Sequence, residues 1–258
     1  MFVLPIEPVL VFILIFVRAL LLLAFLPVYG EVFTPVRARV LLAATLAVVI
    51  APLVDLDLSL FPTSLPEFFI LMLPEALLGF SLGLVGRLLF AAMQFGGTII
   101  GKEIGFQFAN MIDPSQTVQI PVVGQLMYVA SLLVFLAVRG DHQFFLAFER
   151  SFQLAPPGFF DGPDNLHIFF NRRATEMFIV AVQLAMPVVT SIFVVNVGMG
   201  MMAKGVPQMH VFMESFPIKI LLGLMLLSIV ASFMIRIMVD RTMAMGADLQ
   251  NLLRLFAQ

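Results

Sequence analysis

The sequence contains no cysteine and no tryptophan among its 258 residues, and only 12% of its side chains are charged. Without cysteine the chain has no disulfide, no thiolate metal site and no cysteine nucleophile. An ordinary soluble domain is about one quarter charged, so the composition argues against a soluble enzyme. Lys and Arg total 14 and Asp and Glu total 16, which gives a net charge of −2. No basic excess is present to bind the phosphates of a nucleic acid.

Catalytic and metal-binding motifs are also missing. The three histidines, His142, His167 and His210, lie far apart and form no zinc-binding His-Glu-x-x-His pattern. Neither a Gly-x-Ser-x-Gly nucleophile elbow nor a phosphate-binding Gly-x-x-x-x-Gly-Lys loop occurs. The acidic pair at Asp55 and Asp57 is more typical of a solvated turn than of a metal site. The sequence therefore predicts no enzyme, no metal and no cofactor.

Long apolar segments dominate the chain, which is 61% hydrophobic and has a mean hydropathy of +1.08. A helix needs about 20 mainly apolar residues to cross the hydrocarbon of a bilayer. The fold class is therefore predicted to be all-α, a polytopic helical protein of about six apolar segments with kinked or broken helices. The predicted segments are Val9–Tyr29, Val40–Val54, Phe68–Phe95, Ile120–Val138, Met177–Met202 and Ile220–Val239. We expect Pro52, Pro74 and Pro187 to kink or split helices.

The connections between these segments carry little information on orientation. If the segments alternate across a membrane, nearly equal numbers of Lys and Arg fall on the two sides, so the positive-inside rule gives no direction. Either the segment count is wrong, or some apolar helices are not simple membrane spans. The longest connection, Arg139–Arg173, holds two Pro-Gly-rich clusters, and we predict turns rather than a folded domain there.

One arginine lies inside an apolar segment. Arg18 is near the middle of the first segment, where an arginine costs about 2.5–3.5 kcal/mol on insertion scales and needs a partner or a watery cavity. Glu75, in the third segment, is the natural counter-charge, and we predict a buried ion pair between them. The alternative is that Arg18 snorkels toward the interface, or that its helix is not embedded in lipid at that depth.

Glycines recur at four-residue spacing in two places. They are Gly79 and Gly83, and then Gly97, Gly101 and Gly105. On a helix, residues at this spacing share one face and allow another backbone to come close. We therefore predict helix packing at these glycines, with a re-entrant or broken helix over 96–105. A loop is the alternative there, because Lys102 and Glu103 interrupt the run.

Residues 106–121, FQFANMIDPSQTVQIP, interleave aromatic and apolar groups with uncharged amides and a turn signal at Asp113-Pro114. Non-helical backbone at membrane depth survives only inside protein or along an aqueous cavity. The stretch therefore suits a loop that lines or blocks a pore, while an ordinary surface loop is the alternative. The candidate pore residues are Phe106, Gln107, Phe108, Asn110, Met111, Ile112, Asp113, Pro114, Gln116 and Gln119.

Taken in order, these residues resemble the FliR family, the R subunit of the flagellar export gate, whose injectisome counterpart is SctT. The resemblance covers nearly the whole chain. It is carried by Arg18, Pro27, Pro35, Arg39 and Pro52, by the Glu75-Gly79-Gly83 and Gly97-Gly101-Gly105 series, by Asp113-Pro114 and Pro121, by the stretch RGDHQFFLAFERSF over 139–152, and by Pro187, Asn196, Pro207-Gln208 and 216–220.

The resemblance implies a chain built as a P-subunit-like part, residues 1–170, fused to a Q-subunit-like helical hairpin with a C-terminal tail, residues 171–258. The turn of that hairpin would be marked by Pro207, Gln208, Pro217 and Lys219. Residues 106–121 would form a plug in the pore.

The resemblance also implies partners and a location. The chain would join FliP-like and FliQ-like subunits in a helical hetero-oligomer, next to FlhB-like and FlhA-like components, and would pass unfolded export substrates. It would lie in the bacterial inner membrane within the flagellar basal body, with the core raised above the membrane plane. Helices that face partner helices rather than lipid would explain the absence of an orientation signal.

A stand-alone secondary transporter of a small solute is the alternative function. It is disfavoured by the scarcity of acidic residues inside the apolar segments, by the lack of clear inverted repeats and by the absence of a charge bias. An intramembrane enzyme would need a nucleophile and a base, and the sequence offers no such pair.

Overall fold

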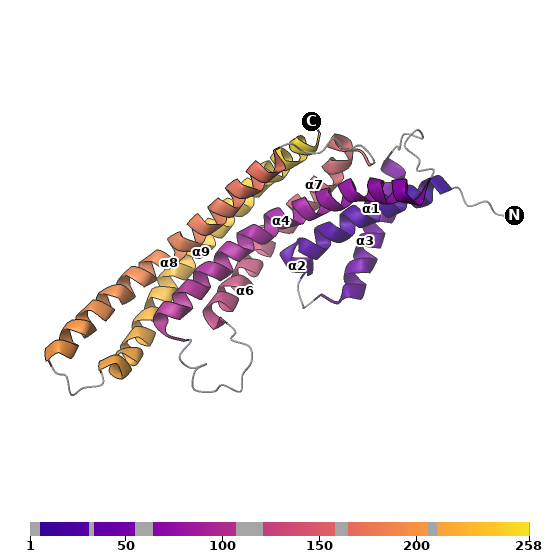
Figure 1. Ribbon diagram of the computed structural model, residues 1–258. Coiled ribbons are helices and arrows are strands. Elements are labelled where there is room, and N and C mark those ends of the chain that lie inside the picture. Colours follow the sequence, from indigo (N-terminus) through magenta and orange to yellow (C-terminus); the bar gives the residue numbers. More distant parts are fainter. Residues whose placement is uncertain are drawn as a thin grey trace. The chain divides into compact units, whose positions relative to one another are not determined.

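The computed structural model describes residues 6–30, 34–54, 64–106, 121–157, 165–205 and 211–257 (Figure 1). Within these ranges the chain is helical apart from short turns, and they contain no strand. The elements are α1 (Ile6–Phe25), α2 (Pro27–Gly30), α3 (Val36–Ile50), the 3-10 helix η1 (Ala51–Leu53), α4 (Leu65–Ile104), α6 (Val122–Ala137), α7 (Gly140–Leu154), α8 (Leu166–Gly205) and α9 (Val211–Phe256). The prediction of an all-α fold is confirmed.

Among the described residues, five helices are long and apolar enough to cross a membrane: α1, α3 with η1, α4, α8 and α9. Helices α6 and α7 add a sixth candidate if they are taken together as one broken span, bent by 66°. The bend falls at Arg139, whose backbone is left-handed with φ 55°. The described part of the chain thus has five or six candidate spans, in agreement with a polytopic helical membrane protein.

Helix α4 corrects one expectation. It runs without a break from Leu65 to Ile104, so the predicted re-entrant or broken helix over 96–105 is wrong. The helix ends at Gly105, where φ is 97°. The Gly105 N–H donates to the Lys102 carbonyl and the Phe106 N–H donates to the Gly101 carbonyl, each at 3.1 Å, which is a Schellman cap. Gly105 therefore terminates the helix instead of continuing the packing face of Gly97 and Gly101.

Helix α7 was not among the predicted apolar segments. The connection 139–173, in which two Pro-Gly-rich clusters predict turns, also contains α7 and the start of α8. The buried residues of α7 recur with the helical period; they are Gly140, Phe144, Ala147, Phe148, Ser151 and Phe152. Charged and amide side chains on the other face lower the average hydropathy, so this amphipathic helix did not stand out as an apolar run.

The prolines split no helix. Pro74 and Pro187 each lie inside a continuous helix, α4 and α8, although a proline removes one backbone hydrogen bond. Pro52 lies in η1, directly after α3 ends at Ile50. Packed neighbours make interior prolines tolerable in apolar helices, which explains why α4 and α8 continue past them.

The chain forms two compact units. Unit 1 consists of Met1–Leu88, Arg139–Arg173 and Thr242–Gln258, and unit 2 consists of Leu89–Val138 and Ala174–Arg241. Helices α4, α8 and α9 each contribute to both. The division of the chain at residue 170 into P-like and Q-like parts stays a prediction, since it concerns likeness to other subunits.

In unit 1, glycines of α4 admit the neighbouring helices. A Cβ at Gly79 would collide with the backbone of Arg18, and one at Gly83 would lie 2.6 Å from Cβ of Phe25, so both meet α1. One turn further, Gly86 faces the Phe144 ring of α7, with 2.9 Å from the added Cβ to Cζ. The first half of α4 is thus in contact with α1 and α7.

In unit 2 the same pattern continues on the second half of α4. A Cβ at Gly97 would lie 2.8 Å from Cα of Gly124, so α4 and α6 touch backbone to backbone. Gly96 faces α8, with 3.0 Å from its added Cβ to the Ala181 carbonyl oxygen. Ring contacts support these approaches: Phe90 meets Phe135 of α6 edge-on, with ring centroids 5.2 Å apart.

A prediction concerns the contact between Gly97 and Gly124. Replacing Gly97 with alanine places a methyl group against backbone atoms that side-chain rotation cannot clear. We expect a loss of about 1–3 kcal/mol, typical of overpacking, and a fall of roughly 2–4 °C in unfolding temperature per kcal/mol. Thermal unfolding of the purified protein in detergent measures it.

Gly198→Ala is the matched control, because no atom of the described residues lies within 4 Å of the position of its added Cβ. It should leave the unfolding temperature unchanged or raise it, since alanine is the better helix former. Equal unfolding temperatures for the two variants would contradict the close approach of α4 and α6.

Candidate functional site

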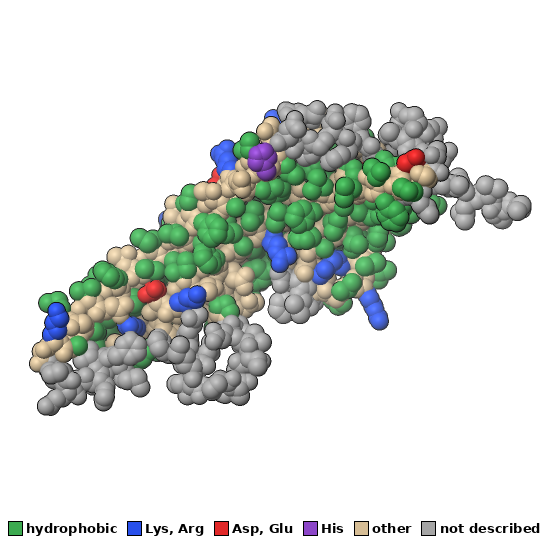
Figure 2. Space-filling view, in the orientation of Figure 1, with side chains coloured by type: hydrophobic (Ala, Val, Ile, Leu, Met, Phe, Trp, Pro, Cys, Tyr) green, Lys and Arg blue, Asp and Glu red, His purple; other side chains and the backbone are tan. Residues whose placement is uncertain are grey.

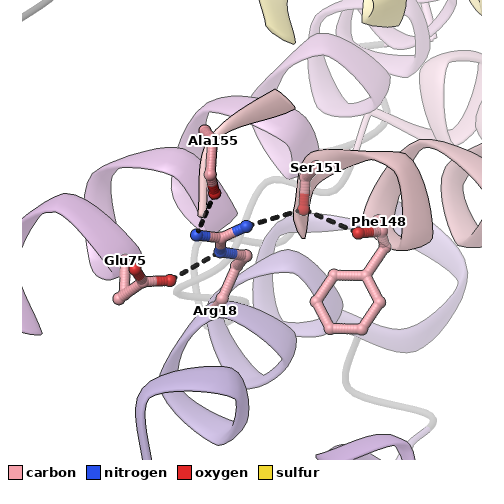
Figure 3. Close-up of polar contacts among 5 residues, drawn as sticks. All are labelled: Arg18, Glu75, Phe148, Ser151 and Ala155. Atoms are coloured by element: carbon pink, nitrogen blue, oxygen red, sulfur yellow. Dashed lines mark hydrogen bonds and ion pairs between the residues drawn. The ribbon is translucent and has the colours of Figure 1, made fainter. Parts of the chain in front are cut away.

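Arg18 of α1 lies at the centre of a buried polar cluster in unit 1 (Figure 3). Its Nε donates to Oε2 of Glu75, on α4, at 2.6 Å, and the two side chains are 2% and 1% exposed. The structure thus brings together the two residues that the sequence analysis paired. Arg18 is enclosed by protein within unit 1, so its guanidinium does not snorkel out of it.

Helix α7 completes the coordination of the guanidinium. Nη1 of Arg18 donates to Oγ of Ser151 at 2.8 Å, and Nη2 donates to the Ala155 carbonyl at 3.1 Å. The Ser151 hydroxyl donates in turn to the Phe148 carbonyl at 2.6 Å. The Phe152 ring lies under the guanidinium, 4.3 Å from Cζ of Arg18 to the ring centroid. One cation therefore joins α1, α4 and the end of α7.

The electrostatics of this cluster favour specificity over stability. Burying an ion costs several kcal/mol, and a buried pair recovers that cost only with good geometry and further hydrogen bonds. Arg18 has both, because each of its three nitrogens donates to an oxygen. An apolar contact can slide by a turn at little cost, whereas this arrangement fixes the register of three helices.

The sequence analysis missed Ser151 and Ala155 as partners of Arg18. They lie 133 and 137 residues away along the chain, so no local pattern links them to it. A signal was present in α7 itself: Ser151 is the one hydroxyl on a helical face otherwise made of glycine, alanine and phenylalanine. A lone hydroxyl on a buried face needs a hydrogen-bond partner, and a buried arginine is a suitable one.

A second contact in unit 1 ties α2 to α7. The Tyr29 ring meets Phe145 edge-on, with centroids 5.9 Å apart, and the Tyr29 carbonyl accepts a hydrogen bond from Nε of Arg39 at 2.9 Å. Burial raises the pKa of Tyr29, and the Asp141 carboxylate raises it further. The phenol therefore stays neutral at physiological pH.

The candidate plug lies almost entirely outside the described residues. Only Phe106, in the turn after α4, and Pro121, before α6, are described. The remaining candidates are outside; they are Gln107, Phe108, Asn110, Met111, Ile112, Asp113, Pro114, Gln116 and Gln119. The two described ends adjoin helices α4 and α6, which pack against each other. Gly97 meets Gly124, and an added Cβ on Gly101 would lie 3.3 Å from the Val123 side chain.

The residues assigned to the hairpin turn fall in different places. Pro207 and Gln208 lie outside the described residues, in the connection between α8 and α9. Pro217 and Lys219 lie inside α9, which begins at Val211, so the expectation that they mark the turn is wrong. Nζ of Lys219 is 5.9 Å from the Phe216 ring centroid. Helix α9 continues past Pro217, as α4 and α8 continue past Pro74 and Pro187.

In the described part of the chain no three residues of the types His, Cys, Asp and Glu come together as a metal site would require. Three of the described acidic residues, Glu75, Glu176 and Asp248, form ion pairs. Arg173 of α8 binds Asp248 of α9 with 2.6 Å between Nη2 and Oδ1, and Arg241 of α9 lies 3.6 Å from Glu176 of α8.

Comparison with known proteins identifies the family. The model of the family described as "Bacterial export proteins, family 1" matches residues 9–245. The chain belongs to this family, the family of FliR. It is 34% identical over 251 residues to the flagellar biosynthetic protein FliR of Bacillus subtilis, covering 95% of each chain. The FliR proteins of Escherichia coli (28% identity; 82% of this chain, 80% of the other) and Aquifex aeolicus (30%; 78% and 77%) are also similar. The predicted resemblance is confirmed.

A prediction follows for the Arg18 cluster of this FliR-family chain. Arg18→Met removes the cation that faces Glu75 inside the protein and should cost about 3–5 kcal/mol. Replacing both charges, as Arg18→Met with Glu75→Leu, should recover most of that loss, since apolar pairs of similar volume often match buried ion pairs in stability. Thermal unfolding in detergent and the yield of folded protein measure both variants.

Arg254→Met is the control, because Arg254 is exposed at the end of α9 and should have little effect. A double variant as unstable as Arg18→Met alone would show that the pair does not govern stability at this site.

Proposed function

We propose that this FliR-family chain is a structural channel component of the flagellar type III protein export gate. The observation that carries the proposal is the family match over residues 9–245, with relatives named flagellar biosynthetic protein FliR. In this role the chain forms, with FliP-like and FliQ-like subunits, the pore through which unfolded proteins leave the cytoplasm. It catalyses no reaction itself. Membership of an export-protein family favours this role over a stand-alone carrier of small solutes.

The surface of α8 and α9 supports an assembly. Large apolar side chains are exposed along both helices, and Figure 2 shows how widely hydrophobic side chains cover the described part of the visible face. Those on α8 include Phe178, Ile179, Val182, Met186, Phe193, Val194, Val197, Met201 and Met202, and those on α9 include Leu221, Leu224, Met225, Ile229, Phe233 and Ile235. Such surfaces need lipid or partner helices to cover them.

The glycines of α8 indicate that helices of partner subunits cover its exposed apolar surface. An added Cβ at Gly198 or Gly200 would meet no described atom within 4 Å, so neither glycine packs against another helix of the described part of this chain. A glycine inside a helix costs up to about 1 kcal/mol relative to alanine. Close approach of a helix from another subunit would explain why glycines stand there.

The α8–α9 pair supports the Q-subunit-like assignment of residues 171–258. The two helices run side by side in opposite directions (Figure 1), and the ion pairs from Arg173 to Asp248 and from Glu176 to Arg241 connect them. Two long antiparallel helices are what a helical hairpin requires. Residues 1–170 would then form the P-subunit-like part, which contains the Arg18 cluster.

In this proposal residues 106–121 are the plug of the pore. The stretch connects the end of α4 to the start of α6, and these two helices are tightly packed against each other. Their contact would hold both ends of the plug close together. In the closed state the aromatic and amide groups would hold back ions and water. An unfolded substrate would displace them during export, and uncharged adaptable groups would bind no particular sequence strongly.

The proposed location is the bacterial inner membrane, within the flagellar basal body. FlhB-like and FlhA-like components would lie next to the complex. A core held by partner helices above the membrane plane accounts for the even distribution of Lys and Arg between the two sides of the apolar segments.

Deletion of residues 107–119 tests the plug. We expect the complex containing the shortened chain to assemble and to leak ions across the inner membrane, because nothing would then fill the pore. The leak is measured in cells by sensitivity to small permeant ions and confirmed with the purified complex in vesicles. A chain shortened by residues 158–163, between α7 and α8, is the control and should remain tight. An intact complex that lacks 107–119 and does not leak would rule out the plug.

A further inference from the structure

Ile104, the last residue of α4, is inserted into a gap in α9. Its side chain is fully buried, and the gap exists because residue 223 of α9 is glycine. A Cβ at Gly223 would lie 2.7 Å from Cδ1 and 3.0 Å from Cγ2 of Ile104, with Cγ1 closer still. The isoleucine therefore fills the space that any side chain at position 223 would need. Both residues belong to unit 2.

The same turn of α4 is held on two further sides. Gly101 lies against Val123 of α6, and the Schellman cap at Gly105 directs the chain into Phe106. Ile104 is β-branched, so its side chain has few rotamers with which to avoid an obstacle. A change at Gly223 would therefore displace the end of α4 rather than be absorbed by side-chain motion.

We infer that Gly223 is a positioning residue for the gate: it seats Ile104 and thereby fixes the turn Gly105–Phe106 in the closed state. The inference rests on the proposed function, because Phe106 is the first residue of the plug. It adds a role for α9, which the plug assignment alone does not involve. Since α9 also presents exposed apolar residues such as Leu221 and Met225 to its surroundings, a partner that shifts α9 would move the end of α4 through this contact.

The buried environment of Gly223 distinguishes it from two glycines of α8. Gly198 and Gly200 of α8 have open space where their Cβ atoms would be, whereas the space beside Gly223 is occupied by a side chain from another helix. A contact of this kind, a side chain fitted into a hole on a facing helix, has one good register. It therefore holds the end of α4 in one position against α9.

The absence of cysteine from the chain permits a direct test. In a chain carrying Phe106→Cys, residue 106 bears its only thiol. The rate at which a maleimide labels that thiol in the assembled complex, followed by mass spectrometry of this chain, reports how firmly the turn is held. The rate is compared among the Phe106→Cys chain, the same chain with Gly223→Ala, with Ile104→Ala, and with both substitutions. Gly205→Ala, at the end of α8, is the matched control, because no described atom lies within 4 Å of its added Cβ.

We expect Gly223→Ala to raise the labelling rate about tenfold. Overpacking by a methyl group shifts the equilibrium between the held and the released turn by about 5- to 150-fold, and the expected change lies within this range. The pair Gly223→Ala with Ile104→Ala should return to within about twofold of the reference rate, because the smaller side chain makes room for the new methyl group. Gly205→Ala should leave the rate unchanged. In chains that keep Phe106, ion leak should follow the same order.

Labelling of Gly223→Ala at the reference rate, or no recovery in the double variant, would overturn the inference. If Gly223→Ala fails to assemble, Ile104→Val provides the second variant: a smaller side chain in the same hole should raise the labelling rate, and an unchanged rate would overturn the inference. The proposed function fails separately. If labelling follows the expected order while deletion of 107–119 causes no leak, Gly223 still positions the end of α4, and the assignment of the plug is wrong.

Discussion

The structure depends on close backbone approach along α4. Six glycines of this 40-residue helix, Gly79, Gly83, Gly86, Gly96, Gly97 and Gly101, meet atoms of α1, α7, α8 or α6 at distances that leave little or no room for a side chain. In an apolar environment the hydrophobic effect alone does little to associate helices, so van der Waals contact at short range must do so. Spacing the glycines along both halves of one helix lets a single element take part in both units of the chain.

In unit 1 the Arg18 cluster adds a polar constraint on the register of the helices. The guanidinium has three nitrogens that donate to oxygens of Glu75, Ser151 and Ala155, so a shift of α1, α4 or α7 would leave a buried charge without its hydrogen bonds. In unit 2 the corresponding constraint is steric: Ile104 fits α9 only at Gly223. The end of α4, from which the proposed plug begins, is thereby fixed relative to the helices of its own unit.

The sequence predicted those features that have a large local cost. A charge inside an apolar run requires a partner, so Arg18 and Glu75 could be paired, and repeated four-residue spacing pointed to Gly79, Gly83, Gly97 and Gly101. It could not predict features that depend on distant neighbours. Gly223 and Gly124 are single glycines whose meaning comes from helices far away in the chain, and Ser151 is separated from Arg18 by 133 residues. Helix α7 was missed because its amphipathic pattern was averaged with adjoining turns. The role of Gly105 as a helix cap was missed because four-residue spacing occurs both on a packing face and at a helix end.

The central claim is that this chain works as one subunit of a protein-export channel. Native mass spectrometry tests it most directly, applied to the detergent-extracted chain after co-expression with P-type and Q-type subunits from the same cell. The account predicts a discrete multi-subunit complex that contains one copy of this chain. A monomer or a homodimer that binds neither subunit would contradict the claim and would favour a stand-alone carrier.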